Sequence, residues 1–201
     1  MKNVVVFGAA GHTGKYIVRK FREMKEVELT AFVRNPTKFG TMDISGVRII
    51  QGDALNKEDV EKALAGQEIV LASLEGDVLT MAKNIISCAC AKEGTVRRII
   101  WITGMGIHHE IRGMRGKMLD MLAKSRPEYI EAADQIAGSG IPYTLLRCPG
   151  IQDGENTKYY LTTEAEQPRK KNVDRAAIAQ CMADMTENET IGENESLGIT
   201  N

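Results

Sequence analysis

The chain has 201 residues, of which 43% are hydrophobic and 26% charged, and its formal net charge at pH 7 is −1. These values are typical of a soluble globular domain with a substantial core, and we expect residues 1–201 to form a single domain. A net charge so close to zero argues against nucleic acid or an anionic membrane as a partner. No apolar run approaches transmembrane length and the first residues lead straight into a strand pattern without a signal-peptide region, so we expect a cytoplasmic protein.

A glycine-rich turn follows the first predicted strand, residues 4–7, which is entirely bulky and apolar. Gly8, Gly11 and Gly14 are spaced three apart, and a helical pattern begins directly after them. In dinucleotide-binding proteins such glycines permit the tight turn, the approach of the backbone to a pyrophosphate and the close packing of helix on sheet. The helix would also point its positive end at the phosphates. A purely structural turn is the alternative, but the position between strand and helix favours a dinucleotide site.

The second predicted strand, residues 29–33, ends on Arg34 rather than on an acidic residue. In nicotinamide-binding folds an acidic residue here bonds the ribose 2′-hydroxyl, whereas an arginine accommodates a 2′-phosphate. We therefore predict NADP as the preferred cofactor, with NAD possible, and Lys38 as a candidate second cation. The alternative is that Arg34 is a solvated loop charge.

Strand and helix patterns then alternate along the chain, which predicts a parallel sheet with right-handed crossovers. Asn56 and Asp174 precede two helical patterns as candidate N-caps, and a third helix begins at about Asp77 and ends near Lys92. The further predicted strands are residues 47–51, 68–72, 98–103, 143–147 and a short edge strand at 159–163, and the further helices are residues 56–64, 127–137 and 174–185, with an acidic loop at 187–195.

Residues 104–125 interrupt this alternation with four glycines, four methionines and two histidines. One interpretation is an insertion over the carboxyl edge of the sheet, where methionines adapt to a flat apolar ligand. The other is a short helix in which Met118, Met121 and Leu122 pack inward. We expect no metal site at His108 and His109, because adjacent histidines on an extended segment point opposite ways.

The chain resembles the atypical short-chain dehydrogenase/reductases, in the NmrA-like group that includes biliverdin reductase B and NADH-flavin reductases. The resemblance spans nearly the whole chain and depends on residues 8–14, 33–36, 52–54, 63–67 and 139–144. It implies an α/β fold, namely a Rossmann-like doubly wound parallel sheet in three layers, α/β/α, with strand order 3-2-1-4-5-6-7. It also implies a dinucleotide across the switch between strands 1 and 4.

The same resemblance implies cofactor-binding roles for matching residues. The turn and the helix start would hold the pyrophosphate, and Arg34 would bind the 2′-phosphate. Asp53 and Ala54 would contact the adenine edge, and residues after the later strands would line the ribose and the nicotinamide. The turn residues are Gly8, Ala10, Gly11, His12, Thr13 and Gly14, and those of the nicotinamide end are Ser73, Leu74, Thr103, Cys148 and Pro149. Thr103 and Tyr129 are the candidate catalytic residues.

The chain departs from the superfamily at its usual proton-transfer residues. Gly104 stands where a serine is usual, and the pattern Tyr129-x-x-x-Ala133 keeps the tyrosine but lacks the lysine that lowers its pKa. Ordinary ketone reduction is therefore disfavoured. Tyr129 either contacts the nicotinamide as a weak proton donor or simply packs its helix, and the sequence leaves both alternatives open.

Two functions are consistent with these residues. The first is an NAD(P)H-dependent oxidoreductase that reduces a conjugated small-molecule acceptor, such as a flavin, a quinone or a tetrapyrrole-like ring. The second is an NADP-binding, redox-sensing regulatory protein without turnover. In either case we expect a monomer or weak homodimer and four reduced cysteines, since none has Cys-x-x-Cys spacing.

Overall fold

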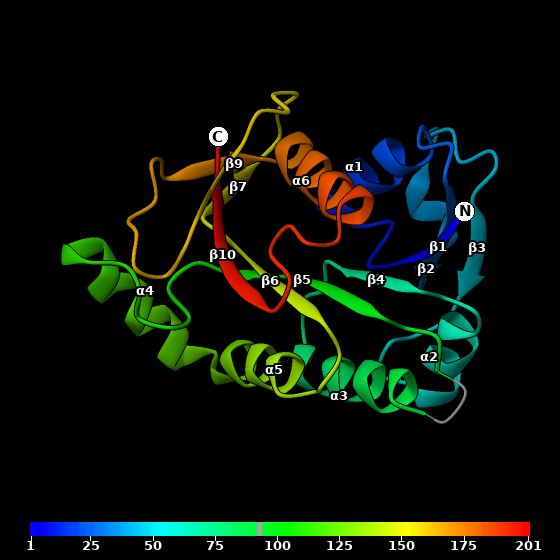
Figure 1. Ribbon diagram of the computed structural model, residues 1–201, viewed down its shortest axis with the longest axis horizontal. Coiled ribbons are helices and arrows are strands. Elements are labelled where there is room, and N and C mark those ends of the chain that lie inside the picture. The colour runs from blue at the N-terminus through cyan, green and yellow to red at the C-terminus, as the bar shows by residue number, and fades with distance from the viewer. Residues whose placement is uncertain (92–93) are drawn as a thin grey trace.

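The computed structural model describes residues 1–91 and 94–201, and these form a three-layer α/β structure around a sheet of eight strands (Figure 1). Seven neighbouring strands are parallel and the eighth, at the edge, is antiparallel. In spatial order they are β3 (Arg48–Gln51), β2 (Val27–Val33), β1 (Lys2–Phe7), β4 (Ile69–Ala72), β5 (Arg98–Gly104), β6 (Tyr143–Cys148), β10 (Glu195–Thr200) and β8 (Tyr160–Thr162). The predicted doubly wound Rossmann-like fold is confirmed.

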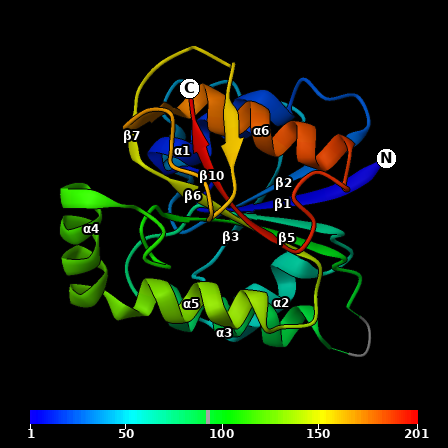
Figure 2. The same cartoon turned by 60° about the vertical axis from the view of Figure 1, so that its left-hand side comes forward.

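Helices cover both faces of the sheet. α1 (His12–Phe21) and α6 (Arg175–Glu187) pack together on one face, and α2 (Lys57–Leu64), α3 (Val78–Ala89) and α5 (Pro127–Ala137) cover the other (Figures 1 and 2). α4 (Gly113–Ser125) leads into α5 and projects beyond the carboxyl ends of the strands.

The core consists of two apolar clusters, one on each side of the sheet. On β1, Val4 and Val6 belong to the cluster beneath α1 and α6, whereas Val5 and Phe7 belong to the cluster beneath α3 and α5. Because alternate side chains point to opposite faces and both faces are covered, a central strand has to be apolar throughout. This is why residues 4–7 read as an unbroken hydrophobic run.

Local capping signals locate two of the predicted helix starts. The Asn56 side chain accepts hydrogen bonds from the N–H groups of Glu58 and Asp59, and that of Asp77 from Thr80. α3 begins where predicted but ends at Ala89, and Lys92, where it was expected to end, lies outside the described residues.

Asp174 precedes α6 as predicted but does not cap it. Within the described residues its carboxylate makes no cap bond. It accepts hydrogen bonds instead from Gln152 Nε2 at 2.7 Å and from the Asn156 N–H at 3.4 Å. Asp174 therefore ties the segment after β6 to the start of α6.

Three short strands were not predicted. β7 (Gly150–Gln152) and β9 (Asn172–Asp174) pair with each other in a small parallel sheet, and β10 inserts between β6 and β8.

Of the helices among the described residues, none is both long enough and apolar enough to cross a lipid bilayer.

Candidate functional site

A cleft lies at the carboxyl ends of β1 and β4, where the crossovers from the two strands leave to opposite faces of the sheet. Such a switch point is the usual ligand site of open α/β sheets. Two adjoining cavities make up the cleft, one of about 600 Å³ and one of about 960 Å³. Both are lined by Thr13, Ser73, Leu74, Glu75 and Ile151, so together they form one continuous groove.

The glycine turn between β1 and α1 forms one wall of the smaller cavity. Gly8 has a φ of +78°, and a Cβ there would lie 2.1 Å from the Ser73 carbonyl oxygen. A Cβ at Gly14 would lie 2.1 Å from the Gly8 carbonyl oxygen, so Gly14 lets α1 approach the strand. Gly11 is exposed on the cleft side. No bulkier residue fits at Gly8 or Gly14, as the spacing predicts.

The N-terminus of α1 is suited to bind an anion. Within the described residues it has no side-chain cap and no acidic residue in its first turn. Its first N–H groups therefore lack carboxylate or hydroxyl partners and carry the positive end of the helix dipole. The predicted turn residues Gly8, Ala10, Gly11, His12 and Thr13 all line this cavity.

Arg34 and Lys38 also line this cavity. Among the described residues, the exposed Arg34 guanidinium takes part in no hydrogen bond or ion pair. Asn35 Oδ1 accepts a hydrogen bond from the Thr37 N–H at 3.0 Å and begins the short 3-10 helix η1 (Pro36–Phe39). This turn brings Lys38 to the cavity that Arg34 lines. Asp53 and Ala54 line the adjacent wall.

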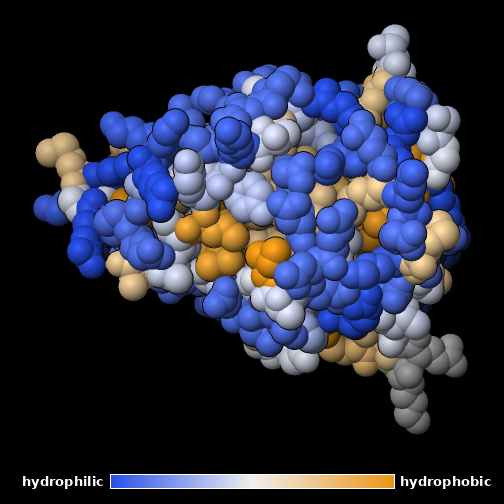
Figure 3. Space-filling view, turned by 45° about the horizontal axis from the view of Figure 1, so that its top comes forward, coloured by the Kyte–Doolittle hydropathy of each residue, from blue (hydrophilic) through white to orange (hydrophobic). Residues whose placement is uncertain are grey.

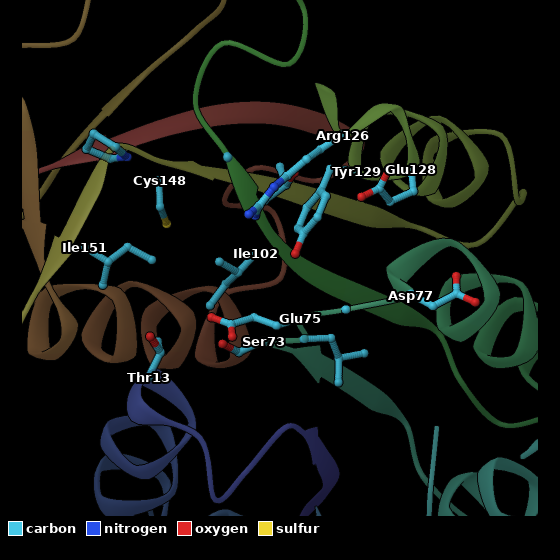
Figure 4. Close-up of a pocket in the computed structure, with 15 residues that line it drawn as sticks. Thr13, Ser73, Glu75, Asp77, Ile102, Arg126, Glu128, Tyr129, Cys148 and Ile151 are labelled. Atoms are coloured by element: carbon cyan, nitrogen blue, oxygen red, sulfur yellow. The ribbon is translucent and has the colours of Figure 1, made fainter. Parts of the chain in front are cut away.

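The larger cavity lies over the ends of β4, β5 and β6 (Figure 4). It brings together the predicted residues Ser73, Leu74, Thr103, Cys148 and Pro149. All the predicted cofactor-binding residues except Gly14, which is buried behind the turn, therefore line one cavity or the other.

Thr103 provides a direct test of whether a polar ligand fits. The residue is 5% exposed, and within the described part of the chain its Oγ1 has no hydrogen-bond partner. A buried hydroxyl without a partner costs free energy, on the order of 1–3 kcal/mol. The place of this hydroxyl in the cavity lining fits a bound cofactor or acceptor that completes its hydrogen bonding.

Cys148 forms a neutral part of the same wall. It is buried, and burial raises the pKa of its thiol, which donates a weak hydrogen bond to the Leu146 carbonyl at 3.7 Å. It therefore stays protonated and presents an apolar sulfur to the cavity.

Tyr129 combines features of both alternatives. It lies half-buried on α5, and its ring packs against the core cluster beneath α3 and α5. Its hydroxyl nevertheless points into the larger cavity (Figure 4). Ala133 is buried one turn further along the helix, and among the described residues no lysine lines this cavity. The missing lysine is not replaced from elsewhere in the described structure.

Several charged residues that the sequence analysis did not select also line the larger cavity. They are Glu75 and Asp77 after β4, and Arg126 and Glu128 at the start of α5. The carboxyl end of a predicted strand was a usable signal for Glu75 and Asp77. Arg126 directly precedes the helix predicted at residues 127–137, but nothing in the sequence indicated that its side chain would face the cavity.

The insertion lies beyond the carboxyl edge of the sheet, but three of its methionines do not face a ligand. Met114, Met118 and Met121 are 88%, 64% and 74% exposed, and apolar side chains at the projecting end of α4 stand out at the left of Figure 3. The helix of the second alternative is present, but Met118 and Met121 do not pack inward, because Gly116, Leu119 and Ala123 form its inner face. Leu122, 54% exposed, lies at the edge of that face.

A buried ion pair holds the loop that leads into α4. Glu110 and Arg147 pair at the end of β6, with side chains 2% and 1% exposed, and Glu110 also accepts a hydrogen bond from the Gly106 N–H.

His108 and His109 contact different carboxylates, those of Glu164 and Asp120. Within residues 1–91 and 94–201 no three histidine, cysteine or acidic side chains gather as metal ligands would.

Fold and cleft together define a Rossmann-like protein built to bind a dinucleotide. The chain belongs to the NAD(P)H-binding family, whose model matches residues 8–189. The NAD(P)-binding Rossmann fold that the family resemblance implied is likewise confirmed.

Curated relatives match most of this chain but only part of their own. Quinone oxidoreductase 2 of Escherichia coli K12 is 28% identical over 150 residues, which are 72% of this chain and 47% of the relative. Isoflavone reductase homolog A622 of Nicotiana tabacum is 25% identical over 162 residues, 75% of this chain and 49% of the relative. The chain thus spans about half the length of the curated relatives it matches.

Solved structures match over the full length. A Rossmann-fold NAD(P)-binding family protein from Shigella flexneri superposes with a TM-score of 0.84 at 29% identity, covering 100% of this chain and 94% of that one. ChuY of Escherichia coli O157:H7, described as an anaerobilin reductase, superposes with a TM-score of 0.80 at 19% identity, covering 99% and 97%. At that identity the second likeness shows the fold alone.

Proposed function

We propose that this protein is an NAD(P)H-dependent reductase of a conjugated small-molecule acceptor, such as a flavin, a quinone or a tetrapyrrole-like ring, and that it prefers NADPH. The observation that carries the proposal is the larger cavity. It continues the dinucleotide groove, holds the unpartnered Thr103 hydroxyl, and within the described residues lacks the lysine of ordinary ketone reductases.

The proposed cofactor site uses the groove from end to end. The N–H groups at the start of α1 bind the pyrophosphate, and Arg34 with Lys38 binds the 2′-phosphate. Asp53 and Ala54 border the adenine. Thr103 Oγ1 bonds a polar atom at the nicotinamide end, where the apolar Cys148 sulfur and Pro149 orient the ring.

When bound, the cofactor supplies the hydride, that is, two electrons and one proton. The chain's own residues orient the nicotinamide ring and the acceptor ring and limit the access of water to them. A conjugated acceptor delocalises the charge it receives, so the second proton can come from water. Tyr129, with no lysine among the described residues of the cavity, contributes at most a weak proton donor to this step.

The same missing residues also support a second candidate, an NADP-binding redox sensor without turnover. Oxidation of NADPH at 340 nm with FMN, menadione or dichlorophenolindophenol separates the two. We expect oxidation with at least one acceptor. Tight binding of NADP by calorimetry together with no oxidation of NADPH by any acceptor would favour the sensor.

A further inference from the structure

A narrow apolar groove of about 150 Å³ opens beside the larger cavity, beneath the inner face of α4. Its apolar lining comprises Met105, Ile107, Leu119, Leu122, Ala123 and Ile130. Gly104, Arg126 and Tyr129 line both the groove and the larger cavity, so the two are continuous. Apolar cavities of about this size hold a benzene-sized ring.

Arg126 lies at the mouth of this groove. Arg126 joins α4 to α5, with φ −139° and ψ 60°, and its N–H donates a hydrogen bond to the Ala123 carbonyl at 3.1 Å. Its side chain reaches back into the cavity, with the guanidinium carbon 6.0 Å from the centre of the Tyr129 ring (Figure 4). Among the described residues the guanidinium has no hydrogen bond or ion pair, although Glu128 lines the same cavity.

Three carboxylates and one guanidinium line the larger cavity, and Glu128 is on α5 close to Arg126. Glu75 and Asp77 come from the β4–α3 connection, and Asp77 is engaged as the N-cap of α3 by the Thr80 N–H at 3.1 Å. Arg126 comes from the α4–α5 connection, next to the apolar groove. Because Arg126 is the one cation among the described residues that line this cavity, a ligand that bears a negative charge is favoured in the orientation that places this charge at Arg126.

We propose that Arg126 determines which acceptors bind. The acceptor is a planar conjugated ring whose apolar edge enters the groove beneath α4, and which carries a carboxylate or phosphate bound by the Arg126 guanidinium. A guanidinium matches the oxygens of either anion with two parallel hydrogen bonds. The inference rests on the proposed function, because the ring has to meet the nicotinamide end of the cleft.

Matched acceptors test the charge. FMN and riboflavin share one ring system and differ by a phosphate, and anthraquinone-2-carboxylate and 2-(hydroxymethyl)anthraquinone differ by a carboxylate. At low salt we expect the KM of the wild type to be about tenfold lower for the anionic member of at least one pair. Arg126→Ala should abolish this difference by raising the KM of the anionic member alone, and Arg126→Lys should restore part of it.

Two further variants separate the roles of charge and groove. Lys124→Ala removes an equally positive, exposed side chain two residues away that lines neither cavity, and should leave both KM values unchanged. Ala123→Leu fills the groove and should weaken neutral and anionic acceptors alike.

Binding without turnover keeps this test separate from the proposed function. Quenching of flavin fluorescence in the presence of NADP⁺ reports the Kd of FMN and riboflavin directly. Selective binding of FMN without oxidation of NADPH would support the Arg126 site and refute the reductase. Equal affinity of the wild type for both members of both pairs, or equal losses for both members in Arg126→Ala, would overturn the role of Arg126.

Discussion

The proposed preference for NADP can be tested at one side chain, Arg34. Its guanidinium lines the cavity that the glycine turn also lines, and within the described residues nothing neutralises it. A hydrogen bond to a charged group contributes about 1.5–3 kcal/mol, or roughly ten- to a hundredfold in affinity. Because Arg34 is exposed and therefore screened, we expect the lower end, about a tenfold loss of NADP affinity in Arg34→Ala.

Calorimetric titration with NADP⁺ and NAD⁺ measures this effect. NAD affinity should change little, because NAD lacks the 2′-phosphate. The loss for NADP should shrink at high salt, and Lys38→Ala should show a smaller loss of the same kind. Arg48→Ala removes an exposed cation on β3 that lies outside the cavity, and should have no effect.

Two results would refute this reasoning. Equal affinity of the wild type for both cofactors would show that the 2′-phosphate is not recognised. Equal losses of NADP and NAD in Arg34→Ala would show that Arg34 maintains the local fold rather than binding the phosphate.

Four other predictions follow from the same structure. Gly11→Val should abolish dinucleotide binding and leave the thermal unfolding transition nearly unchanged, because Gly11 is exposed on the cleft side of the turn; unchanged calorimetric affinity would disprove the pyrophosphate site. Tyr129→Phe should change kcat only a few-fold, whereas loss of a true general acid costs roughly a hundredfold or more. All four cysteines should titrate as free thiols under denaturing, non-reducing conditions, and a count of two would contradict the free thiols seen here. Hydrogen bonding to Arg97, aided by Lys2, lowers the pKa of Glu189 to about 2 from an ordinary 4.5. These contacts therefore stabilise the fold fully above pH 4.5, and their contribution to the free energy of unfolding decreases as the pH falls towards 2. Since Lys2 and Arg97 are partly exposed, Glu189→Gln should lower the free energy of unfolding by only on the order of 1 kcal/mol at pH 7. The substitution should also flatten the pH dependence of chemical unfolding between pH 4.5 and 2, and an unchanged pH profile would contradict this role of Glu189.

Local interactions explain which features could be predicted from the sequence. The apolar run at residues 4–7, the glycine spacing, the cap at Asn56 and the helix start near Asp77 each depend on residues a few positions apart. The alternation of elements predicted the parallel sheet, and the family resemblance implied the strand order, which positions the switch point between β1 and β4. Most of the predicted cofactor-binding residues directly follow predicted strands, and the family resemblance implied their roles.

Only the tertiary structure decided the remaining features, because each depends on residues far apart in the chain. β10 is recognisable through its pairing with β6 and β8, and β7 through its pairing with β9. The inner face of α4 depends on what the helix packs against, and the sequence pattern led instead to its exposed methionines. The groove and the position of Arg126 at its mouth likewise follow from how α4 meets α5 and the end of β5. Patterns in sequence report what a residue's neighbours along the chain require, whereas a binding surface is formed by neighbours in space.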